Sequence, residues 1–213
     1  MSEQAQVPRA GLGEQPAVRR VRAQDVPALA EMLARAFYDD PVTQWAWRPD
    51  ELRLRALERF QATRMRQLLG GEEVWASEDL QCAALWAPPE HWHATLRETA
   101  ELVPAFRHPR LLARMPLVAL GWEKLERSHP RKPPHYYLAV LGTEPSAQGR
   151  GLGSRVLRAV LDQCDRDAVG AYLESSKESN IAFYARHGFR VTEEFRLLRG
   201  PLMWKMWRDP LGG

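Results

Sequence analysis

The sequence predicts a mixed α/β fold built on one central sheet, and three observations lead to that prediction. Short apolar or β-branched runs alternate along the chain with longer segments whose apolar residues recur at helical spacing. The run HYYLAVLG at 135–142 is apolar at nearly every position, as expected for a central strand covered on both faces. A glycine-rich turn joins that strand to an amphipathic helix. We expect about six or seven strands flanked by helices.

The first half of the chain predicts three strands and two long helices. In chain order we expect a strand at 18–22, a helix at 23–37 with Asp25 near its start as a cap, an irregular segment at 38–50 rich in proline and aromatic residues, a helix at 51–69 stopped by Gly70 and Gly71, a strand hairpin at 73–87, and helical pieces interrupted by prolines at 91–129.

The second half predicts four strands around two helices. We expect the strand at 135–142, a helix with Val156, Leu157, Val160, Leu161 and Cys164 along one stripe, a strand at 171–176, a short helix within 179–189 ended by Gly188, and two closing strands at 189–195 and 201–207.

Length and composition suit one ordinary globular domain. The chain has 213 residues, of which 45% are hydrophobic. We expect a single domain at 18–208, a disordered tail at 1–17 that lacks the apolar core of a secretory signal, and a short tail at 209–213. No apolar run approaches the ~20 residues of a membrane span.

Cysteine usage and charge restrict the compartment and the partners. Cys82 and Cys164 lie far apart in apolar contexts, so we expect reduced core thiols in a cytoplasmic protein without a metal site. The net charge of +3 comes from dispersed arginines, which fits solvated helix faces or a positive field that attracts a phosphorylated small molecule. Nucleic-acid binding needs a denser basic stripe, so we expect neither a nucleic-acid nor a membrane partner.

The glycines of SAQGRGLGSRV favour close approach of backbone amides to an anion. A dinucleotide fingerprint would need a third glycine where Ser154 stands, and no βαβ repeat surrounds the turn. A nucleotide P-loop would need a Gly-Lys-Ser/Thr ending. The third possibility is a Q/R-x-x-G-x-G/A turn at 148–153, which cradles a pyrophosphate against the positive end of the following helix.

With this turn and the segments around it, the sequence resembles the GNAT N-acetyltransferases. YLAVLGTEPSAQGRGLG, AYLESS and NIAFYARHGF occur in the order and spacing of that family, and the similarity runs from about 18 to 208. The segments EVWASED, AALWAPPE and LESS look most like its puromycin N-acetyltransferase branch. The resemblance implies a sheet splayed between its two central strands and acetyl-CoA as co-substrate, with direct acetyl transfer to a primary amine.

The same resemblance assigns a cofactor-binding set. Backbone groups at a bulge in the first central strand would contact the acetyl and pantetheine groups, and Gly142, which interrupts an apolar strand, independently suggests that bulge or simply the strand end. Asn180 would contact the cofactor, cap the short helix, or do both. The implied residues are Leu141, Gly142, Thr143, Gln148, Gly149, Arg150, Gly151, Leu152, Gly153, Ser154 and Asn180.

Two residues are candidates for proton transfer. Glu174 is the candidate base, because an acid in a central strand is otherwise out of place, although a carboxylate paired with an arginine is the plain alternative. Glu144 is a weaker rival, whereas Asp39 and Asp40 would orient a cationic acceptor. The resemblance selects Tyr184 as the proton donor to the departing thiolate, and the alternative is an ordinary core tyrosine.

The acceptor is poorly determined by the sequence. Trp45, Trp47, Trp86 and Trp92 would line an aromatic pocket or belong to the core, and His91 and His93 would lie at the surface or rim. We expect a small-molecule primary amine, such as an aminonucleoside, another amine-bearing antibiotic or a metabolite, and a monomer or homodimer. The alternatives are a protein or peptide N-acetyltransferase and a non-catalytic acyl-CoA-binding module.

Overall fold

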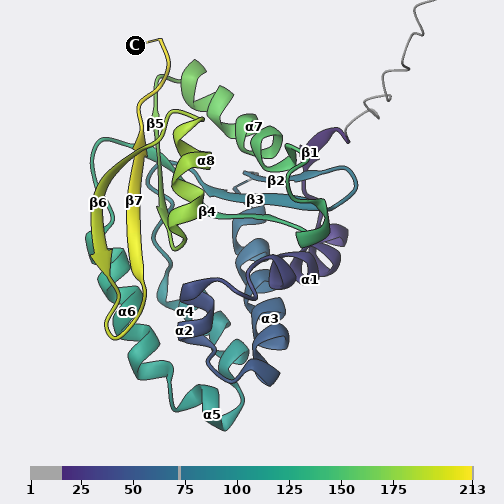
Figure 1. Ribbon diagram of the computed structural model, residues 1–213, viewed down its shortest axis with the longest axis vertical. Coiled ribbons are helices and arrows are strands. Elements are labelled where there is room, and N and C mark those ends of the chain that lie inside the picture. The colour runs from purple at the N-terminus through teal and green to yellow at the C-terminus, as the bar shows by residue number, and fades with distance from the viewer. Residues whose placement is uncertain (1–15, 72, 213) are drawn as a thin grey trace, which may run out of the picture.

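The computed structural model describes residues 16–71 and 73–212 and contains a seven-stranded mixed sheet with helices on both faces (Figure 1). The strand order is β1-β2-β3-β4-β5-β7-β6, and the two central neighbours β4 and β5 run parallel. This confirms the expected fold class. The strands are β1 (Val18–Arg20), β2 (Val74–Ser77), β3 (Cys82–Ala87), β4 (His135–Thr143), β5 (Gly170–Ser175), β6 (Arg190–Arg196) and β7 (Leu202–Arg208).

The helices follow the predicted order with one addition. Most of the tail expected at 1–17 lies outside the described residues. The helices are α1 (Val26–Ala36), α2 (Pro41–Ala46), α3 (Asp50–Leu69), α4 (Leu96–Leu102), α5 (Pro109–Leu112), α6 (Met115–Ser128), α7 (Leu152–Arg166) and α8 (Ile181–Ala185), with short 3-10 turns at η1 (Ala23–Asp25), η2 (Val103–Phe106), η3 (Pro145–Ala147) and η4 (Glu178–Asn180).

Helix α2 forms inside the segment that the sequence predicts to be irregular. Asp40 caps it, since its Oδ1 accepts hydrogen bonds from the backbone N–H groups of Val42 and Thr43 at 2.9 and 3.1 Å. Pro41 follows at the first helical position, where a proline costs no hydrogen bond. The prolines and aromatic residues of this segment are typical of a loop, so the capping pattern of Asp40 and Pro41 was not recognised as a helix start.

Two hydrophobic layers enclose the sheet. The predicted stripe of α7 is buried against one face, where Val156, Leu157 and Val160 are fully inaccessible. Helices α1 and α3 cover the opposite face of β1–β4, with Leu29 and Leu33 of α1 at its centre. In Figure 1 α7 lies on one side of these strands and α1 and α3 on the other. Both central strands are therefore buried, as their apolar sequences require.

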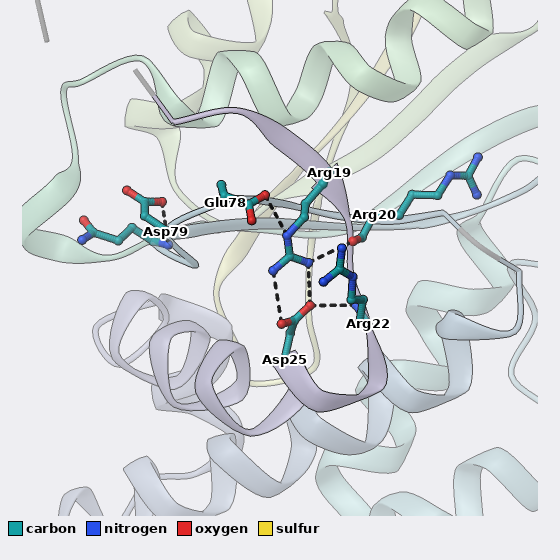
Figure 2. Close-up of polar contacts among 7 residues, drawn as sticks. Arg19, Arg20, Arg22, Asp25, Glu78 and Asp79 are labelled. Carbon is teal, nitrogen blue, oxygen red and sulfur yellow. Dashed lines mark hydrogen bonds and ion pairs between the residues drawn. The ribbon is translucent and has the colours of Figure 1, made fainter. Parts of the chain in front are cut away.

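A salt-bridge cluster fastens the edge strand β1 to the start of α1 (Figure 2). The Arg19 guanidinium donates to both oxygens of Asp25, at 2.6 and 3.2 Å, and forms an ion pair with Glu78 at 2.9 Å. Asp25 also accepts the backbone N–H of Arg22 at 2.8 Å. The carboxylate therefore anchors η1 and β1, and Asp25 stands at the N-cap of α1, as predicted, although its side chain bonds to Arg22 and Arg19 and not to the first turn of α1.

A β-bulge in β4 changes which residues face each helical layer. Leu85 and Trp86 of β3 are opposite Val140 and Leu138, so Ala139 is the extra residue. After the bulge the ladder is regular, and Gly142 pairs with Ala83. The expectation of a bulge at Gly142 is therefore wrong by three residues.

Gly142 is a glycine because α1 crosses it closely. A Cβ at this position would lie 2.6 Å from Leu33 Cδ2 and 3.0 Å from Phe37 Cε2. Both distances are shorter than ordinary van der Waals contacts, so the missing side chain lets the helix pack on the strand.

Both cysteines are buried free thiols, as expected. Burial raises the pKa of Cys82 to about 11 and that of Cys164 to about 12. Within the described ranges, no cluster of three or more His, Cys, Asp or Glu side chains could hold a metal ion. No helix in the same ranges is long and apolar enough to cross a membrane.

Candidate active site

The two parallel central strands separate in the middle of the sheet. Pairing between β4 and β5 runs from His135–Gly170 to Leu138–Leu173 and then stops, while β3 continues to pair with β4 as far as Thr143. The backbone beyond Leu138 therefore has a free side toward β5. This opening, between residues 139–143 of β4 and the end of β5, is called the splay below.

The register decides which residues of β4 offer backbone groups to the splay. Glu144 N–H donates to Gln81 O at 2.8 Å, so hydrogen-bonded pairs in this antiparallel ladder alternate from that point. Gly142 consequently directs its N–H and C=O to β3, whereas Leu141 and Thr143 direct theirs into the splay. Of the three residues expected to contact pantetheine through the backbone, Gly142 is thus the one oriented away.

The glycine turn at the end of β4 has the geometry that the sequence suggests. Gly149 and Gly151 have φ values of +77° and +79°, which disfavour any residue with a Cβ, and open space surrounds both. Gln148 Nε2 donates to Thr143 O at 3.3 Å and ties the turn to the strand. The first backbone bond into α7 is from Arg155 N–H to Gly151 O, so the preceding amides of the first turn have no intrahelical partner.

Ser154 and Asn180 lie beside this turn in different roles. Ser154 Oγ is 2.9 Å from His187 Nε2, which ties the first turn of α7 to the segment after α8. Burial, with nearby arginines, lowers the pKa of His187. Asn180 stands at the N-cap of α8, the position that one of its two predicted roles gives it, but its side chain makes no cap bond.

Glu174 follows directly after the last parallel pair. Its side chain is only 3% exposed, and its Oε1 has no hydrogen-bond partner; the Nδ1 of His129 lies 3.6 Å from this oxygen. The expected alternative of a paired arginine is thus replaced by a histidine. The rival Glu144 is different, because it accepts two bonds at 2.9 Å from the Arg35 guanidinium.

Tyr184 on α8 is buried in the core layer of α7. Burial raises the pKa of its phenol, and the nearby Asp40 and Cys82 raise it further, so the phenol keeps its proton at neutral pH. Thr143 Oγ1 donates to Cys82 Sγ at 3.2 Å, which places Cys82 beside the splay end of β4.

The two aspartates of YDDP are engaged with the end of β5. Ser176 Oγ donates to Asp40 Oδ2, and Lys177 Nζ lies 2.7 Å from Asp39 Oδ1. Burial raises the pKa of Asp40, although these bonds and its backbone bonds oppose the rise. The pair ties the α1–α2 connection to the β5–α8 connection.

The four tryptophans do not form one pocket. Trp45 and Trp47 belong to the hydrophobic cluster under α2, α3 and α6, and Trp86 is fully buried below α7. Trp92 alone of the four stacks on a polar side chain, with its ring 3.7 Å from that of His129. The neighbours His91 and His93 are exposed, as expected.

Sequence reasoning missed the polar and aromatic groups around Glu174. His129, His135, Tyr137 and Tyr172 pack together on the sheet face of Glu174, with ring centroids 4.7–6.1 Å apart. The signal was present in SHPRKPPH, in which two histidines flank a rigid, proline-rich turn. Nothing in the sequence alone shows that this turn folds back over the strand.

Comparison with known proteins identifies the family of this chain. The sequence model described as the acetyltransferase (GNAT) family matches residues 63–189, more than half of the chain. The chain belongs to this family. An uncharacterised N-acetyltransferase of Schizosaccharomyces pombe is 26% identical over 86% of this chain and 78% of its own length. N-alpha-acetyltransferase RimI of Mycobacterium tuberculosis is 30% identical over a shorter stretch, 33% of this chain and 45% of its own.

Solved structures agree on the fold. A crystal structure described as histone acetyltransferase HPA2 and related acetyltransferase, from Corynebacterium glutamicum, is 25% identical, covers 94% of this chain and 99% of its own, and superposes with a TM-score of 0.67. Arylalkylamine N-acetyltransferase 2 from Aedes aegypti is 11% identical over 91% of this chain and 98% of its own, with a TM-score of 0.61. The protein is therefore a GNAT-type N-acetyltransferase, and its family uses acetyl-CoA.

Proposed function

We propose that this protein transfers an acetyl group from acetyl-CoA directly to the primary amine of a small molecule, with Glu174 as the base. One observation carries the proposal. The parallel ladder stops at Leu173, and the very next residue is a buried carboxylate with an unpartnered oxygen at the splay.

The chain offers groups that fit the parts of acetyl-CoA. The open left-handed turn around Gly149 and Gly151, together with the first amides of α7, suits the pyrophosphate. The amide N–H groups of Leu141 and Thr143 and the carbonyl of Leu141 suit the pantetheine arm and the carbonyl oxygen of the thioester. Acetyl-CoA supplies the activated acyl group.

In the proposed reaction the amine nitrogen attacks the thioester carbon, a C–N bond forms, and the C–S bond breaks to release the thiol of CoA. The amine loses one proton to Glu174, and the departing sulfur gains one. Tyr184, whose pKa is raised by burial, stays protonated and donates a hydrogen bond to that sulfur. Holding the two reactants together supplies much of the rate increase, so no covalent enzyme intermediate is needed.

The enclosure of Glu174 supports a small acceptor over an extended peptide. Lys124 Nζ of α6 donates to Arg196 O at 2.7 Å, and a Cβ on Gly200 would lie 3.1 Å from Trp45 Nε1. The β6–β7 hairpin thus packs against α6 and α2 beside the acceptor side of the splay. With Glu174 itself 3% exposed, the side chain is reached through a narrow approach.

The resemblance of LESS and NIAFYARHGF to the puromycin N-acetyltransferase branch supports an aminonucleoside as the first acceptor to test. We also propose that residues 18–208 act as one domain. The peptide alternative remains open because some relatives of similar fold act on protein N-termini, as RimI does by its name.

A thiol-release assay with acetyl-CoA tests the substrate class. The panel contains puromycin, an arylalkylamine, an aliphatic diamine and a short peptide with a free N-terminus. The proposal expects thiol release with one or more small amines, with kcat/KM at least tenfold above that for the peptide. Turnover of the peptide alone would contradict it. No thiol release with puromycin, together with turnover of another small amine, would exclude an aminonucleoside acceptor and leave a small-molecule amine as the acceptor class.

A further inference from the structure

A chain of buried hydrogen-bonding groups leads from Glu174 toward the start of β4. His135 Nδ1 lies 2.8 Å from the carbonyl oxygen of Pro133, and a carbonyl only accepts, so this nitrogen carries a proton. Burial lowers the pKa of His135 and favours the neutral ring. Its Nε2 is therefore an acceptor.

The tautomer of His129 follows from this arrangement. Its Nε2 lies 2.9 Å from the acceptor Nε2 of His135, so His129 donates there. Its Nδ1 is left facing Glu174 Oε1 at 3.6 Å. His129 and His135 are only 6% and 2% exposed, so water does not compete freely for these atoms.

The facing atoms of Glu174 and His129 are a place for one shared proton. With that proton present, either His129 is a cation beside a carboxylate, or a carboxyl group donates to the neutral ring. With it absent, two lone pairs face each other, and the pair is a base.

We propose that His129 is a positioning residue that takes over the proton Glu174 removes from the amine and, with His135, returns it to water between turnovers. The inference rests on the proposed role of Glu174. The proton passes from the amine to Glu174 and then to His129 Nδ1. His135 Nε2 accepts the Nε2–H of the His129 cation, and the proton leaves to water of the surface hollow described below as both rings return to their starting tautomers, so one proton enters and one leaves.

A surface cavity provides the exit. A hollow of about 570 Å³ is lined by Trp92, the turn at 131–134 and His135. Glu90 faces the same hollow. This hollow brings solvent next to His135.

The other titratable groups around the relay do not replace it. Burial raises the pKa of the phenols of Tyr137 and Tyr172, and the charge of Glu174 raises both further, so they stay protonated. Arg64 of α3, which covers the sheet face that carries Tyr137, opposes the rise in the pKa of Tyr137. On β7, next to β5, Lys205 is held by Glu193 at 2.6 Å. On the loop that carries Trp92, His93 pairs with Glu126 of α6.

The test is the pH dependence of kcat at saturating acetyl-CoA and amine, which reports groups in the bound complex. In the wild type we expect kcat to rise with pH as the shared proton is lost. His129→Gln keeps a donor to His135 but has no ring nitrogen opposite Glu174. It should lower kcat by about 10²-fold at pH 7 and change the shape of the pH profile, since the proton then has no second nitrogen to occupy.

Two substitutions of His135 separate its hydrogen bond to His129 from packing. His135→Gln keeps an acceptor near the position of Nε2, whereas His135→Phe keeps the ring shape without it. We expect His135→Gln to retain at least ten times the kcat of His135→Phe. Added imidazole should restore part of the kcat of His129→Ala through the cavity. His93→Gln, which changes an exposed histidine outside the relay, is the matched control.

Thermal unfolding and calorimetric titration with acetyl-CoA show that each variant is folded and binds co-substrate. If Glu174→Gln lowers kcat but His129→Gln keeps the wild-type rate and pH profile, the relay is wrong and Glu174 keeps its proposed role. If Glu174→Gln has the wild-type kcat, the proposed function loses its base, and the relay falls with it. Equal kcat values for His135→Gln and His135→Phe would also overturn the relay.

Discussion

Gly142→Ala separates the packing role of this residue from a role in cofactor binding. The new Cβ would lie 2.6 Å from Leu33 Cδ2 and 3.0 Å from Phe37 Cε2, so α1 or the strand must shift. Overpacking of this kind costs about 1–3 kcal/mol of unfolding free energy. For a chain of this size that corresponds to a fall in Tm of about 2–12 °C.

The affinity for acetyl-CoA should change less than about twofold, since the backbone of Gly142 faces β3. Chemical denaturation measures the first effect and calorimetric titration the second. Gly70→Ala is the matched control, because a Cβ there meets open space. The reasoning fails if Gly142→Ala has wild-type stability, or if it weakens acetyl-CoA binding tenfold at unchanged stability.

Further predictions concern the site and the anchors of the fold. Glu174→Gln should lower kcat by about 10²–10⁴-fold, equal to about 3–5 kcal/mol of activation free energy, with acetyl-CoA affinity retained; a wild-type rate would contradict this. Tyr184→Phe should reduce turnover with binding intact, and full turnover would leave Tyr184 a core residue. The hydrogen bond from Arg19, which is the largest effect, lowers the pKa of Asp25 in the folded state. The stabilisation that the Asp25 carboxylate contributes is therefore present at neutral pH and lost as the pH falls below about 4. Asp25→Asn should flatten that part of a plot of unfolding free energy against pH. Cys82, with its pKa raised to about 11, should resist alkylation at pH 8 until the protein unfolds, and rapid alkylation of the folded protein would contradict its burial.

The spacing of apolar residues predicted most helices and strands, because the strongest elements each have one consistent pattern. The apolar stripe of α7 can pack on the sheet with only one face of the helix, and the apolar run of β4 fits only a central strand. Both elements are found as expected. Helix α2 was missed because its cap depends on Asp40, whose neighbours look like a loop. Asp25 was placed correctly at the helix start, but its pairing with Arg19 was missed because that contact joins two separate elements.

The parts of the site that depend on backbone conformation were predictable from the sequence, whereas the parts that depend on tertiary contacts were not. The left-handed glycines at 149 and 151 appear in the sequence because L-residues rarely adopt that conformation. The bulge at Ala139 has no such marker, since an alanine tolerates it. His129 reaches Glu174 across 45 residues, a contact that no local pattern encodes.

Amide hydrogen exchange with and without acetyl-CoA tests the geometry of the splay most directly. On binding, the amides of Leu141 and Thr143 and those of residues 149–154 should exchange at least tenfold more slowly. The amide of Gly142, already bonded to β3, should change little, and NADH should give no protection. Protection of Gly142 without its neighbours, or equal protection by NADH, would contradict the account of how this protein binds its acetyl donor.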